Sequence, residues 1–376
     1  MIVFGTRPEA IKMAPIIKIL RKNSRFHVRI CVTGQHREML DRVINFFELS
    51  PDYDLNIMSP GQNLSIITSK ALLGLDQVFA KFLPDLVMVH GDTTTTLAAA
   101  ISAYYHQIPV AHVEAGLRTG DIYAPWPEEM NRKLVGSISS LHFAPTELAR
   151  SNLIKENIAS GSIFVTGNTV IDTLFYTLNK IKSDDGVQSY INSQFHFLNN
   201  EKKIILVTGH RRENFGDGFE SICQALLDIS KRDDVQIIYP VHLNPNVQEP
   251  VRRILAGAKN ITLIEPLDYL PFVYLMSRAY IILTDSGGVQ EEAPSLDKPV
   301  LVMREKTERQ EAVDGGTVKL VGTSSKEITN SVNELLDNFT VYDNMIKRAN
   351  PYGDGLASSR IESILLEQYP YKRCHL

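Results

Sequence analysis

The sequence predicts an α/β protein with two doubly wound, Rossmann-like domains. Short runs rich in valine and isoleucine recur along the chain, and segments of helical character separate them. The runs are continuously apolar instead of alternating, which is typical of parallel strands buried on both faces with helices as crossover connections. The 376 residues, 44% of them hydrophobic, are also enough for more than one core.

The expected strands form two series. The first series comprises residues 1–5, 27–34, 85–91, 108–114 and 162–167, and the second comprises residues 203–209, 235–241, 261–266, 279–285 and 298–303. Between them, the polar stretch 179–203 breaks the alternation of strands and helices. We therefore expect an N-terminal domain at residues 1–168 and a C-terminal domain at residues 169–354, facing each other across a cleft.

The composition excludes several classes of partner. A formal net charge of -4 and a pI near 6.2 give no overall attraction to nucleic acid or to anionic lipid. No apolar stretch approaches the roughly 20 residues of a membrane span, and the first residues do not resemble a signal peptide. The three cysteines lie far apart without a CxxC spacing, so no zinc site or disulfide framework is predicted. We expect a cytoplasmic protein without nucleic-acid or membrane partners.

Polar motifs follow five of the expected strands. In doubly wound sheets, ligands bind beyond the carboxyl ends of the strands, where loops lead into helices. The motifs are GTRPEA (5–10), GDTTTT (91–96), EAGLRT (114–119), GHRREN (209–214) and DSGGVQEE (285–292). All of them are expected at the ligand-binding edges of the two sheets. The DYD sequence at residues 52–54 resembles a metal–diphosphate motif, but no second acidic cluster accompanies it, so we predict an ordinary loop and no metal site there.

The motif at residues 285–292 indicates an anion site. Three small residues open its helix, where free N–H groups and the helix dipole attract a diphosphate: Ser286, Gly287 and Gly288. A serine N-cap followed by a turn explains the same residues equally well. Arg7, Lys12 and Arg132 offer cations nearby, although Arg7 could equally be a surface charge. Neither GxGxxG nor GxxxxGK occurs at these turns, so no dinucleotide cofactor is expected.

Three acids from successive loops are candidates for proton transfer: Asp92, Glu114 and Glu128. Carboxylates that are close together and partly desolvated have their pKa values pushed apart, so that one suits a general acid and another a general base. Asp92 could instead be only a helix cap, and Glu114 only a structural acid that binds loop amides. His210, at a strand end, fits either a ligand contact or a structural hydrogen bond, whereas His112 is predicted to lie in the core.

Over nearly its whole length the chain resembles the non-hydrolysing UDP-N-acetylglucosamine 2-epimerases of bacteria. The resemblance rests on FGTRPEAIKMAP, GQHREML, HGDTTTT, HVEAGLRT, PEEMNR, VTGNTVID, HRREN, HLNPNV, DSGGVQEEAP and NPYGDG, which occur in the expected order. It implies a glycosyltransferase-B-like fold, a C-terminal helix at about residues 355–376 that returns to the N-terminal domain, and a homodimer. The implied reaction interconverts UDP-GlcNAc and UDP-ManNAc for cell-surface polysaccharide synthesis.

The chemistry of this reaction explains the acids. C2 of the sugar has no adjacent carbonyl, so the reaction needs either transient oxidation by NAD or loss of UDP across C1–C2. Because the dinucleotide fingerprint is missing, the second route is favoured: a carboxylate removes the C2 proton, 2-acetamidoglucal forms, and a second group returns a proton to the opposite face. The resemblance implies that Asp92, Glu114 and Glu128 are the essential acids and that His210 lies near the phosphate. No cofactor is expected.

The resemblance also implies binding residues. Those for UDP are Arg7, Lys12, Ser286, Gly287, Gly288, Glu292 and Arg309, with Glu292 accepting from the ribose, and Leu267 and Phe272 hold the uracil. Regulated members bind a second UDP-GlcNAc, and the matching positions here are Gln35, Gln62, Arg211 and His242. Gly61 stands where regulated members carry an arginine.

Other activities remain open from these residues. A hydrolysing relative would release free ManNAc and UDP, and a glycosyltransferase could share the architecture. A nucleotide-sugar sensor without turnover is a third alternative, which the retention of all three acids disfavours.

Overall fold

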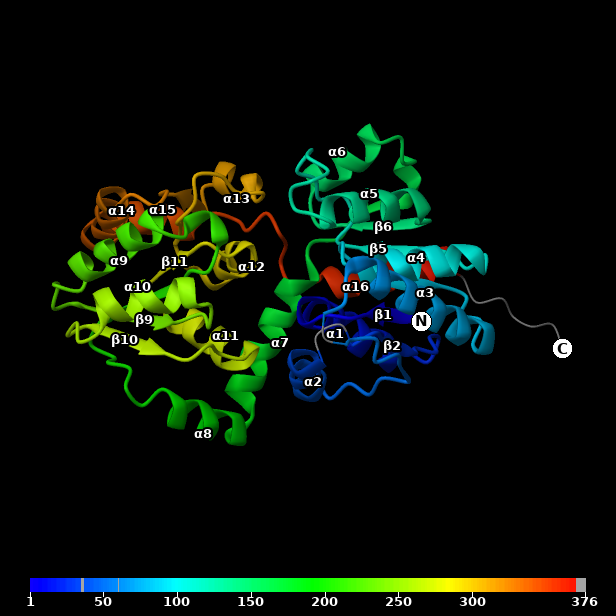
Figure 1. Cartoon of the computed structure of the whole chain (residues 1–376), viewed down its shortest axis with the longest axis horizontal. Coiled ribbons are helices and arrows are strands. Elements are labelled where there is room, and N and C mark those ends of the chain that lie inside the picture. Colours follow the sequence, from blue (N-terminus) through cyan, green and yellow to red (C-terminus); the bar gives the residue numbers. More distant parts are fainter. Residues whose placement is uncertain (35–36, 60, 370–376) are drawn as a thin grey trace. The chain divides into compact units, whose positions relative to one another are not determined.

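The structure is a computed structural model that describes residues 1–34, 37–59 and 61–369. The chain forms two compact units. Unit 1 comprises Met1–Thr173 and Tyr352–Leu376, and unit 2 comprises Leu174–Pro351. One boundary therefore falls inside helix α7 (Thr169–Ser183), and the other precedes Tyr352. In each unit, helices cover both faces of a parallel sheet (Figure 1).

Within the described residues, unit 1 has a seven-stranded sheet in the order β3-β2-β1-β4-β5-β6-β7, and every pair is parallel. Its strands are β1 (Ile2–Phe4), β2 (Ile30–Val32), β3 (Tyr53–Asp54), β4 (Val87–His90), β5 (Val110–Val113), β6 (Leu141–Ala144) and β7 (Ile163–Val165). The strand order reverses between β1 and β4, which is where such sheets bind ligands.

The helices of unit 1 cross over between these strands. They are α1 (Arg7–Lys22), α2 (Arg37–Phe46), α3 (Leu64–Lys81), α4 (Thr94–Tyr105), α5 (Glu128–Ile138), α6 (Glu147–Lys155) and α16 (Ala357–Gln368), together with the first part of α7. Helix α1 begins with a capping box, in which Thr6 accepts from the Glu9 N–H and the Glu9 carboxylate accepts from the Thr6 N–H. Glu9 also accepts from the hydroxyls of Thr93 and Thr96, so it ties the start of α1 to the start of α4.

Unit 2 has a six-stranded parallel sheet in the order β10-β9-β8-β11-β12-β13 over the part of the chain that is described. Its strands are β8 (Lys203–Thr208), β9 (Val235–Pro240), β10 (Ile261–Ile264), β11 (Ile281–Thr284), β12 (Val300–Val302) and β13 (Val318–Leu320). Its helices are α8 (Asp185–Gln194), α9 (Asp217–Ile229), α10 (Pro245–Leu255), α11 (Tyr269–Arg278), α12 (Gly287–Glu292), α13 (Gln310–Asp314), α14 (Ser325–Asp337) and α15 (Phe339–Ile346).

Each unit has its own apolar core. In unit 1, side chains of α3 and α4, such as Phe79 and Ala99, pack on β1 and β4. In unit 2, side chains of α9 and α14, such as Phe219 and Val332, pack on the central strands. None of the helices in residues 1–34, 37–59 and 61–369 combines the length and hydrophobicity that crossing a membrane requires.

The predicted doubly wound α/β class is confirmed, but three strands were missed. Residues 53–54, expected in a loop, form β3, because Cys31 and Val32 of β2 pair with Tyr53 and Asp54. The β6 run LHFA is interrupted by the polar His142, and the β13 run VKL is an edge strand with an exposed lysine. Edge and very short strands bury less apolar surface, so their sequences lack the continuous hydrophobic signal.

Candidate active site

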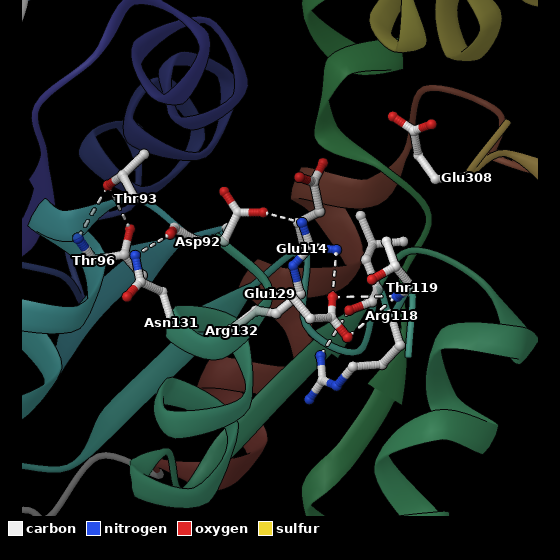
Figure 2. Close-up of polar contacts among 12 residues, drawn as sticks. Asp92, Thr93, Thr96, Glu114, Arg118, Thr119, Glu129, Asn131, Arg132 and Glu308 are labelled. Atoms are coloured by element: carbon white, nitrogen blue, oxygen red, sulfur yellow. Dashed lines mark hydrogen bonds and ion pairs between the residues drawn. The ribbon is translucent and has the colours of Figure 1, made fainter. Parts of the chain in front are cut away.

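Asp92 lies directly after β4, before the Thr93 cap of α4. Its carboxylate accepts a hydrogen bond of 2.6 Å from Arg132 of α5, and its main-chain carbonyl accepts one of 2.8 Å from Asn131 (Figure 2). Asp92 thus accepts hydrogen bonds from two residues of α5, including one from a cation. A cap for α4 was the alternative role for Asp92, but Thr93 is the residue that caps this helix.

Glu114 follows β5 in a left-handed conformation, with φ of 62°. Such a conformation is uncommon for a residue with a long side chain, and it often marks a functional turn. Two residues later, Gly116 has φ of 93°, and a Cβ there would lie 2.2 Å from the Ala149 carbonyl. The β5–α5 turn is therefore closely packed, which restricts where the Glu114 carboxylate can lie.

Three side chains surround Oε2 of Glu114. Lys12 of α1 forms a close ion pair with it, and the Asn168 amide donates to it at 2.8 Å. His90, the last residue of β4, has its Nε2 3.7 Å from the same oxygen. The Glu114 side chain is only 9% exposed, so these contacts lie in a largely desolvated environment. Glu114 therefore does not act by binding loop amides alone, which was the structural alternative.

Glu128 is the first residue of α5 and is half-buried. A pocket of about 410 Å³ in unit 1 brings it together with Arg7 at the start of α1 and with Thr93 and Asn131. The pocket thus joins elements that follow β1, β4 and β5. This arrangement agrees with the expectation that ligands bind beyond the carboxyl ends of the strands.

The charges around Asp92 are electrostatically coupled. Burial raises the pKa of Asp92, Arg132 and Lys12 lower it, and Glu114 and Glu128 raise it further. Three carboxylates and two cations therefore interact within one unit. Such coupling is the arrangement in which two acids of the same chemical type acquire different protonation states.

Sequence reasoning missed Glu129, the neighbour of Glu128. Its side chain is fully buried, and its carboxylate accepts hydrogen bonds from the N–H groups of Thr119 and Gly120 at 3.2 Å. It also pairs with Arg132 at 3.3 Å, the residue that holds Asp92 (Figure 2). The adjacent glutamates in PEEMNR are the sequence signal, because neighbouring helix positions point in directions about 100° apart, so the two acids have different surroundings.

In unit 2, His210 follows β8 and lies next to Asp285, which follows β11. The buried Asp285 carboxylate accepts from the main-chain N–H groups of His210 and Arg211, each at 2.8 Å. The His210 ring lies 3.5 Å from this carboxylate and stacks on His242 at 5.4 Å. Partial burial lowers the pKa of His210, whereas Asp285 raises it. The ring is 41% exposed, so it remains accessible to a ligand.

The start of α12 is built around glycine and arginine. A Cβ on Gly287 would lie 3.1 Å from the Arg309 guanidinium, so glycine permits a close approach between the helix start and this cation. Arg309 pairs with Glu291 at 2.7 Å and with Glu308 at 3.1 Å. Glu292, at the end of α12, accepts a hydrogen bond of 2.6 Å from the Tyr269 hydroxyl. Ser286 is the N-cap residue of α12, but its side chain makes no capping hydrogen bond.

Comparison with known proteins identifies the family. A family model described as UDP-N-acetylglucosamine 2-epimerase matches residues 18–366. A UDP-N-acetylglucosamine 2-epimerase of Yersinia pestis is 60% identical over 360 residues, covering 96% of this chain and 96% of that protein. The chain belongs to the UDP-N-acetylglucosamine 2-epimerase family.

Solved structures of the family have the same fold. The crystal structure of a UDP-GlcNAc 2-epimerase from Neisseria meningitidis bound to UDP-GlcNAc has 51% sequence identity and a TM-score of 0.90, covering 97% of this chain and 99% of that one. A UDP-GlcNAc 2-epimerase from Methanocaldococcus jannaschii in complex with UDP-GlcNAc and UDP has 37% identity and a TM-score of 0.79, covering 97% of this chain and 99% of that one.

The remaining positions implied by the epimerase resemblance lie as follows. Leu267, in the loop after β10, and Phe272, in the first turn of α11, are both half-buried. Gln62 binds its own loop, since its amide donates to the Ile57 carbonyl and accepts from the Ser59 N–H. Arg211 donates to the Asp285 carbonyl at 3.3 Å, and His242 stacks on His210. Gln35 lies outside the described residues.

Among the residues that the structure describes, no group of three or more His, Cys, Asp or Glu could hold a metal ion. Unit 1 brings together coupled carboxylates and cations. In unit 2, the available groups are an exposed imidazole, an arginine beside a glycine, and a carboxylate bound to a tyrosine.

Proposed function

We propose that the chain interconverts UDP-GlcNAc and UDP-ManNAc by eliminating UDP and adding it back. The observation that carries the proposal is the coupling of Asp92, Glu114 and Glu128 with Lys12 and Arg132. Family membership supports the substrate, because relatives bear the epimerase name and one was crystallised with UDP-GlcNAc. The proton chemistry is assigned to unit 1, where the three acids lie.

In the proposed reaction, a carboxylate of unit 1 takes the proton from C2. The electron pair of the C2–H bond forms the C1=C2 double bond, and the C1–O electron pair leaves with UDP. This produces 2-acetamidoglucal. A second acid then returns a proton to the opposite face of C2, and the UDP oxygen adds to C1. Net charge and atoms are conserved, and no redox step occurs.

Unit 2 is proposed to bind the UDP part. The Ser286 hydroxyl and the N–H groups of Gly287 and Gly288 suit the diphosphate as neutral donors, since the Ser286 N–H itself donates to the Thr284 hydroxyl at 2.9 Å. Arg309 suits it as a charged donor, because charged donors make strong hydrogen bonds to phosphate oxygens. Glu292 is assigned to the ribose hydroxyls, and Leu267 and Phe272 to the uracil. His210 is assigned to the departing phosphate, for which its exposed ring is suited.

From unit 1, Arg7, Lys12 and Arg132 are assigned to the substrate as further cations. Lys12 and Arg132 pair with Glu114 and Asp92, respectively, and Arg7 lines the pocket with Glu128. By family resemblance, we also propose a homodimer in the cytoplasm that supplies ManNAc units for surface polysaccharides.

The decisive experiment uses UDP-GlcNAc in deuterated water, with NMR to follow C2 and the products. We expect deuterium at C2 of both UDP-linked sugars, because the C2 proton is lost to the enzyme and replaced from solvent. Accumulation of free ManNAc and UDP would instead indicate a hydrolase. Absence of exchange and of any product would contradict turnover and leave a nucleotide-sugar sensor.

A separate prediction concerns activation by a second UDP-GlcNAc, for which Gln35, Gln62, Arg211 and His242 are the candidate contacts. Gly61 is exposed with φ of 74°, and it removes the cation expected against the second diphosphate. A lost charge-assisted hydrogen bond corresponds to about 1.5 to 3 kcal/mol, or roughly one to two decades in affinity. We therefore expect pure UDP-ManNAc to react without a lag. A lag that trace UDP-GlcNAc abolishes would show that the activating site works without the arginine.

A further inference from the structure

His90 is a buried histidine that the proposed reaction has not yet used. It ends β4, and its side chain is only 5% exposed. Within the described part of the chain, its Nε2 makes no hydrogen bond. Buried polar atoms are rarely left without a partner, so an unpaired one beside a reactive carboxylate calls for an explanation. The atom lies 3.7 Å from Oε2 of Glu114.

The neutral form of His90 places a lone pair towards Glu114. Burial lowers the pKa of His90 to about 4, although Glu114 raises it, so the ring is uncharged near neutral pH. In the tautomer with the proton on Nδ1, the otherwise unpaired Nε2 presents its lone pair to Oε2 of Glu114. The main-chain carbonyl of His90 accepts from the Thr96 hydroxyl at 2.6 Å, which fixes the end of β4.

The facing atoms of Glu114 and His90 are therefore both acceptors when Glu114 is ionised. Their separation of 3.7 Å is longer than a hydrogen bond, which agrees with two facing acceptors that have no proton between them. Lys12 and Asn168 donate to Oε2 and so favour the carboxylate form. The lone pair of His90, by contrast, can accept from the protonated form.

We propose that His90 is a positioning residue for Glu114, whose carboxyl O–H donates a hydrogen bond to His90 Nε2 once Glu114 has taken the C2 proton of the sugar. The inference rests on the proposed function. The C2–H electron pair goes into the C1=C2 bond, and the C1–O pair leaves with UDP. The proton stays on Glu114, so His90 neither gains nor loses one. Lys12 thus stabilises Glu114 before proton transfer, and His90 stabilises it afterwards.

Other charged and titratable groups near Glu114 and His90 also affect the protonation of Glu114. Lys12 of α1 opposes protonation of Glu114, whereas the negative charge of Asp92, after β4, favours it. His112 of β5 is buried and uncharged, with a pKa lowered by burial to about 3, and its Nε2 contacts the Gly91 carbonyl at 2.7 Å. None of these groups offers Glu114 a second neutral acceptor in place of His90.

The test compares three variants of His90 by their pH profiles of kcat in both reaction directions. His90→Leu removes the acceptor, and His90→Asn has an amide too short to reach Glu114. His90→Gln places an amide oxygen close to the position of Nε2. In the reaction direction in which Glu114 is the base, we expect the His90→Leu and His90→Asn variants to have a kcat about five- to tenfold lower than wild type, with little change in KM.

The expected pH shift has a definite sign. Removing a partner of the protonated acid makes Glu114 lose its proton at lower pH. The acid limb of the kcat–pH profile should therefore shift to lower pH by about 0.5 to 1 unit. His90→Gln should restore most of kcat and the wild-type limb. The control is His142→Leu, since this buried histidine of β6 binds the Gly136 carbonyl at 2.9 Å. It should lower stability without shifting the limb.

Two failures can be told apart. If wild-type protein incorporates no deuterium at C2, the proposed function itself is wrong. If it does incorporate deuterium, but the Asn and Gln variants have the same kcat and superimposable profiles in both directions, the role of His90 is overturned. Because Asn and Gln are both polar and differ in reach, their comparison is decisive even if the Leu variant does not fold.

Discussion

Replacing Glu114 by Gln is expected to reduce kcat roughly 10²- to 10⁴-fold in both directions, the effect of losing a positioned acid or base. The amide oxygen of Gln can still accept from Lys12 and Asn168, so the turn and the fold should survive. KM should change little, because the carboxylate is assigned to proton transfer and not to holding UDP. Initial rates measured from each UDP-sugar, with circular dichroism to confirm folding, provide the measurement.

A matched control for this variant is Glu147→Gln. Glu147 begins α6, its side chain is 76% exposed, and its pairing with Arg150 is a surface contact of 3.6 Å. It should retain wild-type kcat. If Glu114→Gln stays within about threefold of the control, Glu114 does not act as acid or base in the reaction.

The second large effect is expected on stability. Glu129→Ala removes a fully buried carboxylate, leaving the Thr119 and Gly120 N–H groups unsatisfied and the Arg132 guanidinium without its 3.3 Å partner. Breaking a buried pair from one side costs about 3 to 5 kcal/mol of the free energy of unfolding. Activity should fall as well, since Arg132 also holds Asp92.

The measurement is urea unfolding followed by circular dichroism. The single tryptophan, Trp126, lies in the loop that Glu129 anchors, but it is already 63% exposed in the folded protein, so its fluorescence changes little on unfolding. Glu147→Ala is the control, and an exposed pair of this kind should change stability by less than about 1 kcal/mol. A Glu129→Ala transition within 1 kcal/mol of wild type would mean that water replaces the carboxylate.

The sequence was sufficient for the fold where strands are buried on both faces. Runs such as KIILVTG have only one physical interpretation once helical segments flank them. The edge strands β3 and β13 have less apolar surface to bury, and β6 carries His142, whose ring is satisfied by the Gly136 carbonyl in a way that no local pattern reveals.

The places of the candidate site residues in the fold were predictable, but their contacts were not. Motif position placed Asp92 and Glu114 after β4 and β5, because chain order determines which residues follow a strand. The partners of these acids come from distant segments: Lys12 from α1, Asn168 from the start of α7, and Arg132 from inside α5. Such pairings depend on tertiary packing, and the order of polar residues in the sequence does not specify them.

The discontinuity of unit 1 has a consequence for biosynthesis on the ribosome. Asn168 binds Glu114 through its amide, while its own N–H donates to the Tyr352 carbonyl at 2.7 Å, and the Asp172 carboxylate accepts from the Ser358 N–H at 2.8 Å. Unit 2 is continuous in sequence, so it can fold as soon as its last residue has been translated. Unit 1 is made first, yet it waits for Tyr352 and α16, a delay of roughly ten seconds or more at usual elongation rates. The surroundings of the Glu114 carboxylate are thus among the last parts of the nascent enzyme to be completed.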